Sequence, residues 1–213
     1  MGYVFVAVDK KVTRSYATKQ SIYIMTNMDN HQIRIYFGSE LANLYELGWI
    51  STDLSQLIEF SELVESGEQD RAEKFFGEKS RPFNRYTALT KKREKRPEIV
   101  DVQKGSIELV IAGASIAVAV IMPLVRISVT RYFERLDETI TFEISPQDKG
   151  LNKIMNAYEK GDFGKDREGL EVLMSVLQER NYNVDVLANN IYLIEHVVEK
   201  YSQRIIRTIK KNK

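Results

Sequence analysis

The N-terminal part of the chain carries apolar residues in the alternating pattern that is typical of strands. The alternation runs through residues 3–8 and 32–37, and residues 21–26 form a further strand-like run. The link Asn27-Met28-Asp29-Asn30-His31 is rich in residues that tolerate turn dihedrals, so it predicts a hairpin between the last two of these strands. We therefore expect an antiparallel sheet at the start of the chain.

From Ser39 onward the apolar residues recur every three or four positions, which predicts helices in place of strands. Gly48 is expected to end a first helix, because glycine commonly follows the last helical turn. The run Ser51-Thr52-Asp53 is expected to supply the N-cap of a second helix. A third helical stretch is predicted over residues 68–76.

The middle of the chain returns to the strand pattern. Residues 98–102 and 107–111 flank a four-residue link that contains Gly105, and this arrangement predicts a second hairpin. Residues 139–144 alternate cleanly between apolar and polar, which predicts a strand with three inward side chains: Ile140, Phe142 and Ile144.

The last third of the chain predicts three helices, over residues 148–160, 165–180 and 184–210. The last of them carries apolar residues at spacings of 4, 3, 4, 3 and 4, a heptad seam made of Leu187, Ile191, Ile194, Val198, Tyr201 and Ile205. Packing of this seam onto the two preceding helices gives a three-helix bundle, which we favour. Packing against a second copy of the chain gives a dimer.

Together these patterns predict an α+β fold of antiparallel strands with helices and a helical, three-helix-bundle-like C-terminal third. We divide the chain into N-terminal strands plus acidic helices (1–78), a basic connector (79–97), strands with a buried apolar element (98–146) and a C-terminal helical bundle (147–213).

The segment from Leu109 to Val125 has 17 residues and no charge. As a helix it would be about 25 Å long, shorter than the roughly 30 Å core of a bilayer. The large and small residues of 116–120 alternate, which favours a strand instead. We favour a buried core element, and the alternatives are a membrane-inserting segment and an oligomer interface.

The net charge of +1 conceals two blocks of opposite sign. Residues 39–78 carry a net charge of −8, and residues 79–96 carry +7. The bases of the second block are Lys79, Arg81, Arg85, Lys91, Lys92, Arg93, Lys95 and Arg96. With the aromatic residues among them they could contact the phosphates and bases of a nucleic acid. The alternatives are a solvated linker between two subdomains and docking of this basic patch on the acidic helices just upstream. The adjacent acidic block favours docking, within one chain or across a dimer.

The chain lacks the usual chemistry of enzyme and metal sites. It has no cysteine, which excludes disulfides, thiolate metal sites and cysteine nucleophiles. Glycine-rich phosphate loops and a nucleophile elbow are absent from the sequence. His31 and His196 have neither the companions of a catalytic triad nor the spacing of zinc ligands. We predict no catalytic residue, metal or cofactor, although a carboxylate-based activity depends on distances that a sequence does not give.

We therefore expect a non-enzymatic binding or assembly protein, as a homo-oligomer or within a larger complex. It would act through its separate acidic and basic surfaces and its C-terminal heptad helix. The alternatives are a membrane-inserting protein that uses residues 109–125 and a nucleic-acid-binding protein that uses residues 79–96. The N-terminus does not follow the pattern of a signal peptide, so we expect a cytoplasmic location, with membrane association as the alternative.

Overall fold

The computed structural model describes residues 33–37, 44–80, 101–103, 106–111, 116–164 and 167–210. Within these residues, four strands form one antiparallel sheet in the order β2-β3-β1-β4. Their bounds are β1 (Ile33–Phe37), β2 (Asp101–Gln103), β3 (Ser106–Ile111) and β4 (Phe142–Pro146). These strands confirm a second hairpin and the strands expected near residues 32–37 and 139–144, but Gln103 pairs with Ser106, so the link of the hairpin is shorter than the four residues predicted. The predicted pairing of 32–37 with 21–26 is wrong, because β1 pairs with β3 along one edge and with β4 along the other. The strands predicted at 3–8 and 21–26 lie outside the described residues.

One face of the sheet is buried, as the alternating pattern indicates. On β1, Ile33 and Ile35 are buried while Arg34 between them is exposed. On β4, Phe142 and Ile144 are buried as predicted, and they lie opposite Phe37 and Ile35 in the register. Ile140 precedes the strand and is half-buried.

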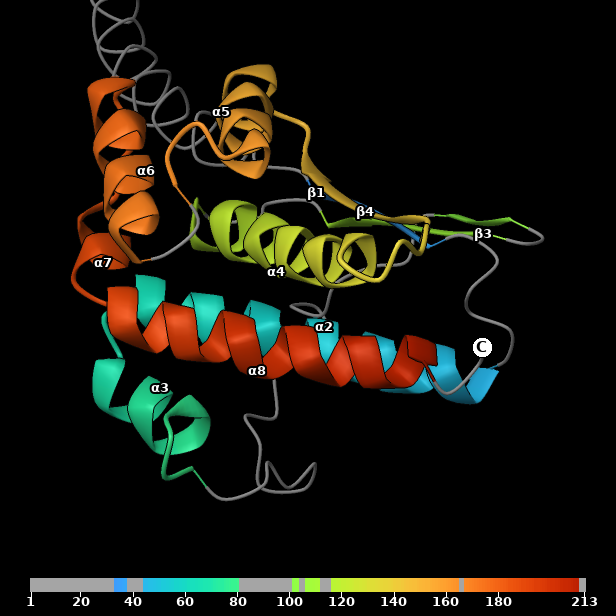
Figure 1. The fold of residues 1–213 in the computed structure, drawn as a ribbon. Helices are drawn as coiled ribbons and strands as arrows, with labels where there is room; N and C mark the ends of the chain where they lie inside the picture. The colour runs from blue at the N-terminus through green and yellow to red at the C-terminus, as the bar shows by residue number, and fades with distance from the viewer. Residues whose placement is uncertain are drawn as a thin grey trace, which may run out of the picture.

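Seven helices in the described residues complete the α+β fold, and the C-terminal third is helical as predicted (Figure 1). Their bounds are α2 (Leu44–Glu65), α3 (Gln69–Phe76), α4 (Ile116–Glu134), α5 (Lys149–Lys160), α6 (Arg167–Glu179), α7 (Asp185–Ala188) and α8 (Ile191–Lys210).

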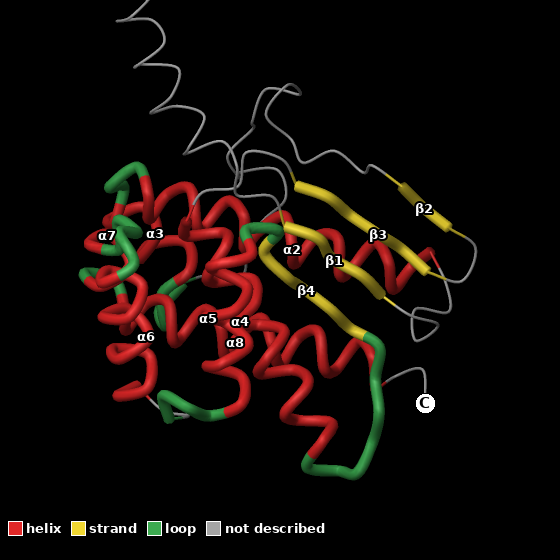
Figure 2. The backbone as a smooth tube through the Cα atoms, turned by 90° about the horizontal axis from the view of Figure 1, so that it is seen from above, coloured by secondary structure: helices red, strands yellow, loops and turns green. Residues whose placement is uncertain are grey.

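Helix α4 forms a middle layer between the sheet and the paired helices α2 and α8 (Figures 1 and 2). Residues 117–125 are buried without a break, which is what a helix that is apolar all round requires. The apolar segment 109–125 is thus divided, because β3 ends at Ile111 and α4 begins at Ile116. The strand interpretation of 116–120 is wrong, since these residues open α4.

The predicted break at Gly48 is also wrong. Helix α2 continues through Gly48, and Asp53 lies inside the helix with a buried side chain. A glycine inside a helix costs about 1 kcal/mol, and packing of α2 on both α4 and α8 outweighs that cost. The helix ends before Gly67, whose φ of 74° is the left-handed conformation that suits glycine.

The predicted helix 184–210 is two helices, because the chain is non-helical at Asn189 and Asn190 between α7 and α8. All six seam residues are buried except Val198, which is half-buried. The principal contacts of α8 are with α4 and α2, and those with α6 and α7 are fewer. The predicted packing of this seam onto the two preceding helices is therefore wrong: the heptad spacing identified the buried side of α8 but not its partners.

Asp148 begins the helical third by capping α5. Its Oδ1 accepts hydrogen bonds from the backbone N of Leu151, at 2.9 Å, and from the hydroxyl of Tyr182, at 3.0 Å. Burial, reinforced by Asp148, raises the pKa of Tyr182 to about 12.

We expect Asp148→Ala to destabilise the fold by about 1 kcal/mol and to lower the pKa of Tyr182. Urea unfolding and ultraviolet titration of the tyrosines measure the two effects. An unchanged stability would contradict the capping role.

Candidate functional site

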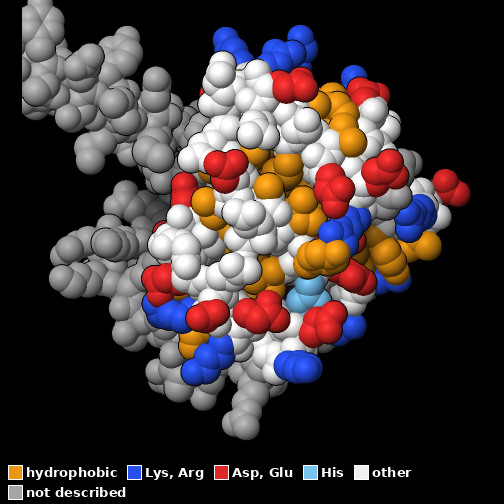
Figure 3. Space-filling model, turned by 90° about the vertical axis from the view of Figure 1, so that its left-hand side faces the viewer, with side chains coloured by type: hydrophobic (Ala, Val, Ile, Leu, Met, Phe, Trp, Pro, Cys, Tyr) orange, Lys and Arg blue, Asp and Glu red, His pale blue; other side chains and the backbone are white. Residues whose placement is uncertain are grey.

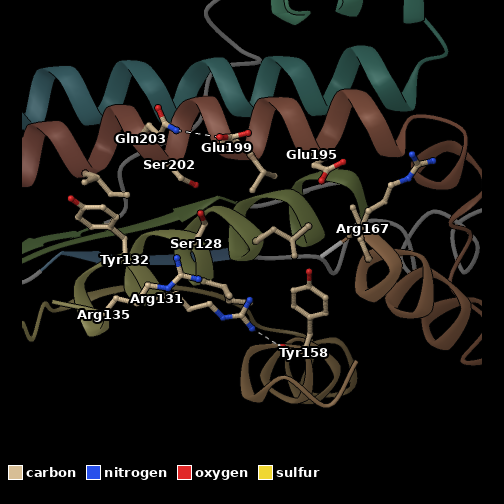
Figure 4. Close-up of a pocket in the computed structure, with 15 residues that line it drawn as sticks. Ser128, Arg131, Tyr132, Arg135, Tyr158, Arg167, Glu195, Glu199, Ser202 and Gln203 are labelled. Atoms are coloured by element: carbon tan, nitrogen blue, oxygen red, sulfur yellow. Dashed lines mark hydrogen bonds between the residues drawn. The ribbon is translucent and has the colours of Figure 1, made fainter. Parts of the chain in front are cut away.

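The α4–α8 cleft is a hollow of about 370 Å³ lined by α4, α5, α6 and α8. Ser128 and Arg131 line it from α4 and Arg135 from the turn just after it, and α8 faces them across the gap (Figure 4). These three residues share one face because they are spaced three and four positions apart, and the backbone N of Arg135 still donates to the carbonyl of Arg131. In Figure 4 the hydroxyl of Tyr158, from α5, also points into the cleft.

Arg131 is fixed by the end of α5. Its guanidinium donates hydrogen bonds to the backbone carbonyls of Tyr158, at 3.0 Å, and Glu159, at 2.9 Å. The last carbonyls of a helix lack partners within the helix and carry partial negative charge, so a cation is stabilised there. Carbonyls do not neutralise the guanidinium, and Arg131 therefore keeps a full positive charge at the cleft wall.

A second arginine ties α4 to α5 beside this contact. The guanidinium of Arg126 donates to both carboxylate oxygens of Glu159, at 2.8 and 2.5 Å. Two-pronged pairs of this kind combine strength with a fixed geometry. The wall that carries Arg131 and Arg135 is therefore held in place by partners outside the cleft.

The opposite wall, on α8, carries Glu195 and Glu199. Gln203 donates to a carboxylate oxygen of Glu199 at 3.2 Å, and Ser202 donates to the carbonyl of Val125 at 3.4 Å. Figure 4 shows the carboxylates on the α8 side and the guanidinium groups of Arg131 and Arg135 on the α4 side. In the described part of the chain no ion pair joins the two walls.

A second hollow, here called the aromatic groove, lies where the start of α2 meets the end of α8. It measures about 330 Å³ and is lined by Tyr45, Glu46, Trp49, Asp53, Arg204, Arg207 and Thr208. The rings of Tyr45 and Trp49 meet edge to face, with centroids 5.9 Å apart. Tyr45 is 72% exposed and Trp49 is 41% exposed, so both rings reach the surface.

The floor of the aromatic groove is a buried polar contact between α2 and α8. Asp53 is only 2% exposed, and its Oδ1 lies 2.6 Å from a guanidinium nitrogen of Arg204. Burial raises the pKa of the Asp53 carboxyl, and the charge of Arg204 partly offsets that rise. One turn deeper, the hydroxyl of Tyr201 donates to Gln56 at 2.8 Å. The groove therefore stands on a rigid base.

The residues predicted for the basic patch fall mostly outside the described residues. Lys79 follows α3 and is exposed, and the other seven lie in 81–100, which the structure does not describe. The predicted heptad residues lie together on one side of α7 and α8, inside the chain's own core. The sequence missed both hollows, although the spacing of Ser128, Arg131 and Arg135 is visible in it. These three residues lie outside the apolar segment 109–125, so the apolar pattern did not single them out.

Two further observations concern metals and membranes. Across the described residues, no three histidine, aspartate or glutamate side chains gather as metal ligands would. Within the same residues, α4 is the one helix long and apolar enough to cross a membrane, and 67% of its most apolar window is buried inside the protein. Length and composition alone do not distinguish such a helix from the core helix of a soluble protein.

Comparison with known proteins gives no relative. No protein-family model matches the chain, and neither a curated protein nor a solved structure matches it.

Proposed function

We propose that this chain is a non-enzymatic binding and assembly protein that associates with a second copy of itself through the aromatic groove. The observation that carries the proposal is the exposed pair of rings, Tyr45 and Trp49, beside the exposed guanidinium of Arg207. Tryptophan, tyrosine and arginine are the residue types that contribute most to protein interfaces.

The groove has the composition that self-association requires. In a twofold dimer the same patch lies on both sides of the interface, so it must be complementary to itself. The aromatic groove offers electron-rich ring faces and a cation side by side. Arg207 of one copy can therefore lie over Tyr45 or Trp49 of the other, a contact favoured by cation–π attraction. The contact between the buried Asp53 and the partly exposed Arg204 fixes both helices beneath these groups, so that little order has to be gained on binding.

The division of charge along the sequence supports the same function. Asp70, Glu73 and Glu78 are exposed on and just after α3, next to the start of the basic connector at Lys79. Complementary charge of this kind increases the association rate and sets orientation more than it adds affinity. The charged surfaces would then guide encounter, while the aromatic groove would supply the contact.

The single tryptophan of the chain makes this proposal directly measurable. We expect light scattering to show a dimer whose fraction rises with concentration, and Trp49 emission to shift to shorter wavelength in parallel. Tyr45→Ala and Arg207→Ala should each raise the dimer Kd about tenfold or more, a cost of about 1.4–3 kcal/mol.

The matched control is Tyr192→Ala, on a different face of the protein. Tyr192 is 67% exposed and stacks with Arg167, whose guanidinium lies 3.3 Å from the ring centroid. The face around α6, α7 and the start of α8 also gathers apolar side chains, with acidic ones around them (Figure 3). A protein that stays monomeric at about 1 mM, or a Kd that Tyr192→Ala raises as much as Tyr45→Ala does, would overturn the proposal.

A further inference from the structure

We propose that the α4–α8 cleft binds a small zwitterion, with its phosphate or carboxylate against Arg131 and Arg135 and its amine against Glu195 and Glu199. This site is separate from the self-association proposed above, since the cleft and the aromatic groove share no lining residue. The inference rests on the placement of opposite charges on the two walls.

The α4 wall has the chemistry of an anion site. In the described part of the chain neither Arg131 nor Arg135 pairs with a carboxylate, so their charges are not neutralised within the protein. Guanidinium forks bind phosphates and carboxylates with two parallel hydrogen bonds. The hydroxyl of Ser128 points from the same face toward the gap and adds a donor (Figure 4).

The α8 wall has the chemistry of a cation site. Glu195 is exposed at the cleft and has no ion-pair partner among the described residues, and Glu199 accepts only the neutral amide of Gln203. An ammonium group donates three hydrogen bonds and is attracted by both carboxylates.

The gap between the two walls is the reason for proposing a ligand that carries both charges. Opposite charges that faced each other in direct contact would form ion pairs, and none is present between these walls. A ligand whose two charges lie far enough apart to reach both walls satisfies them at once, whereas a simple anion leaves the carboxylates of α8 repelling it. The volume of about 370 Å³ lies near the lower end of ligand pockets, which are roughly 300–1,000 Å³. A volume in this range accommodates a whole small molecule.

Isothermal titration calorimetry with defined probes tests the inference. The probes are O-phosphoethanolamine and β-alanine as zwitterions, with inorganic phosphate, acetate and ethanolamine as the single-charge comparisons. Titrations at an ionic strength of about 20 mM keep charge screening weak. We expect at least one zwitterion to bind about tenfold or more tightly than its single-charge parts. The zwitterion that binds identifies the anionic group as phosphate or carboxylate.

Two variants test the contributions of the two walls separately. Arg135→Gln should weaken the zwitterion and its parent anion alike, by about tenfold or more, the scale of one charge-assisted hydrogen bond. Glu195→Gln should weaken the zwitterion and leave the anion unchanged or slightly tighter. Arg180→Gln and Glu179→Gln are the matched controls, since both residues are exposed and lie outside the cleft. Arg131 is left in place because it also holds the end of α5.

A vesicle experiment distinguishes a lipid headgroup from a soluble ligand. Co-sedimentation with phosphatidylethanolamine vesicles that Arg135→Gln abolishes would assign the zwitterion to a lipid headgroup, and its absence would assign it to a soluble molecule. The inference fails if no probe binds at about 10 mM. It also fails if Glu195→Gln has no effect on the zwitterion, or if the controls lose as much affinity as the cleft variants. Tyr45→Ala should leave probe binding unchanged, so failure here and failure of self-association are distinguishable.

Discussion

Replacement of Arg204 by methionine is expected to destabilise the protein by about 3–5 kcal/mol at neutral pH, because it leaves the buried carboxylate of Asp53 without its partner. Asp53 is only 2% exposed, so its carboxylate depends on the guanidinium that lies 2.6 Å away more than on water. Methionine keeps much of the apolar stem of arginine, and the loss therefore reports the charge and not the packing.

The pH dependence of this loss gives a second, independent readout. Burial already raises the pKa of Asp53 in the folded protein, so the folded state binds the proton more readily than the unfolded state. Stability therefore falls as pH rises from the ordinary aspartate value, 3.8, through the raised pKa, and is constant above it. Without Arg204 the pKa of Asp53 rises further, and this window extends to higher pH. The destabilisation by Arg204→Met should accordingly shrink as the solution is acidified and Asp53 becomes neutral.

Urea unfolding of the wild type and the variant, between about pH 4 and pH 8, measures both effects. Arg180→Met is the matched control, because Arg180 is exposed at the end of α6 and should change stability by less than about 0.5 kcal/mol. The double variant Asp53→Asn with Arg204→Met removes the unpaired charge and should recover part of the loss. A deficit for Arg204→Met that is the same at every pH would contradict the assignment.

The local elements of this fold could be predicted where a segment contains its own signals. Helix α5 is amphipathic, begins at a capping aspartate and ends at Gly161 in the left-handed conformation, and its predicted bounds are nearly those observed. Strand β4 alternates so regularly that its inward residues Phe142 and Ile144 follow from the pattern alone. In both cases one face meets the core and the other meets water.

The predictions that failed involve residues whose role depends on distant parts of the chain. Asp53 in the run Ser-Thr-Asp has the character of an N-cap, and it is instead the buried partner of Arg204 on α8. Gly48 has the character of a helix stop, but packing on α4 and α8 carries the helix through it. No local pattern identifies these tertiary contacts.

The two hollows escaped prediction for the same reason. The α4–α8 cleft joins residues of four helices, and Arg131 belongs to it only because the end of α5 holds the side chain there. In the aromatic groove, Tyr45 and Trp49 resemble core residues of an amphipathic helix until their exposure is known. The fold class could therefore be derived from the sequence, whereas the candidate sites needed the three-dimensional arrangement.

Helix α4 shows why apolar composition alone left its environment open. Residues 116–125, its first half, are apolar on all sides, so periodicity gives no buried face, and a bilayer or a protein core would satisfy them equally. In the structure the sheet covers one side, and α2 and α8 cover the other. Ile121, in the middle of the helix, is fully buried by these protein neighbours.

Ile121→Asp is consequently expected to have the largest effect of any single change considered, a loss of about 4 kcal/mol or more, because it places an unpaired charge in the packed core. Such a loss approaches the whole stability of a typical domain. Since this variant should lose its native fold, Ile121→Ala supplies a measurable companion, with an expected cost of about 2–5 kcal/mol. Circular dichroism and urea unfolding of detergent-free protein follow both variants.

The matched control is Leu136→Asp, which makes a comparable chemical change just past the end of α4. Leu136 is 46% exposed, so the new carboxylate meets water and stability should change by about 1 kcal/mol at most. If the apolar surface of α4 faced lipid, the wild-type protein would require detergent to stay soluble, and Ile121→Ala would change its stability little. Folded, soluble Ile121→Asp protein with wild-type stability would contradict the burial of α4 between the sheet and the α2–α8 pair.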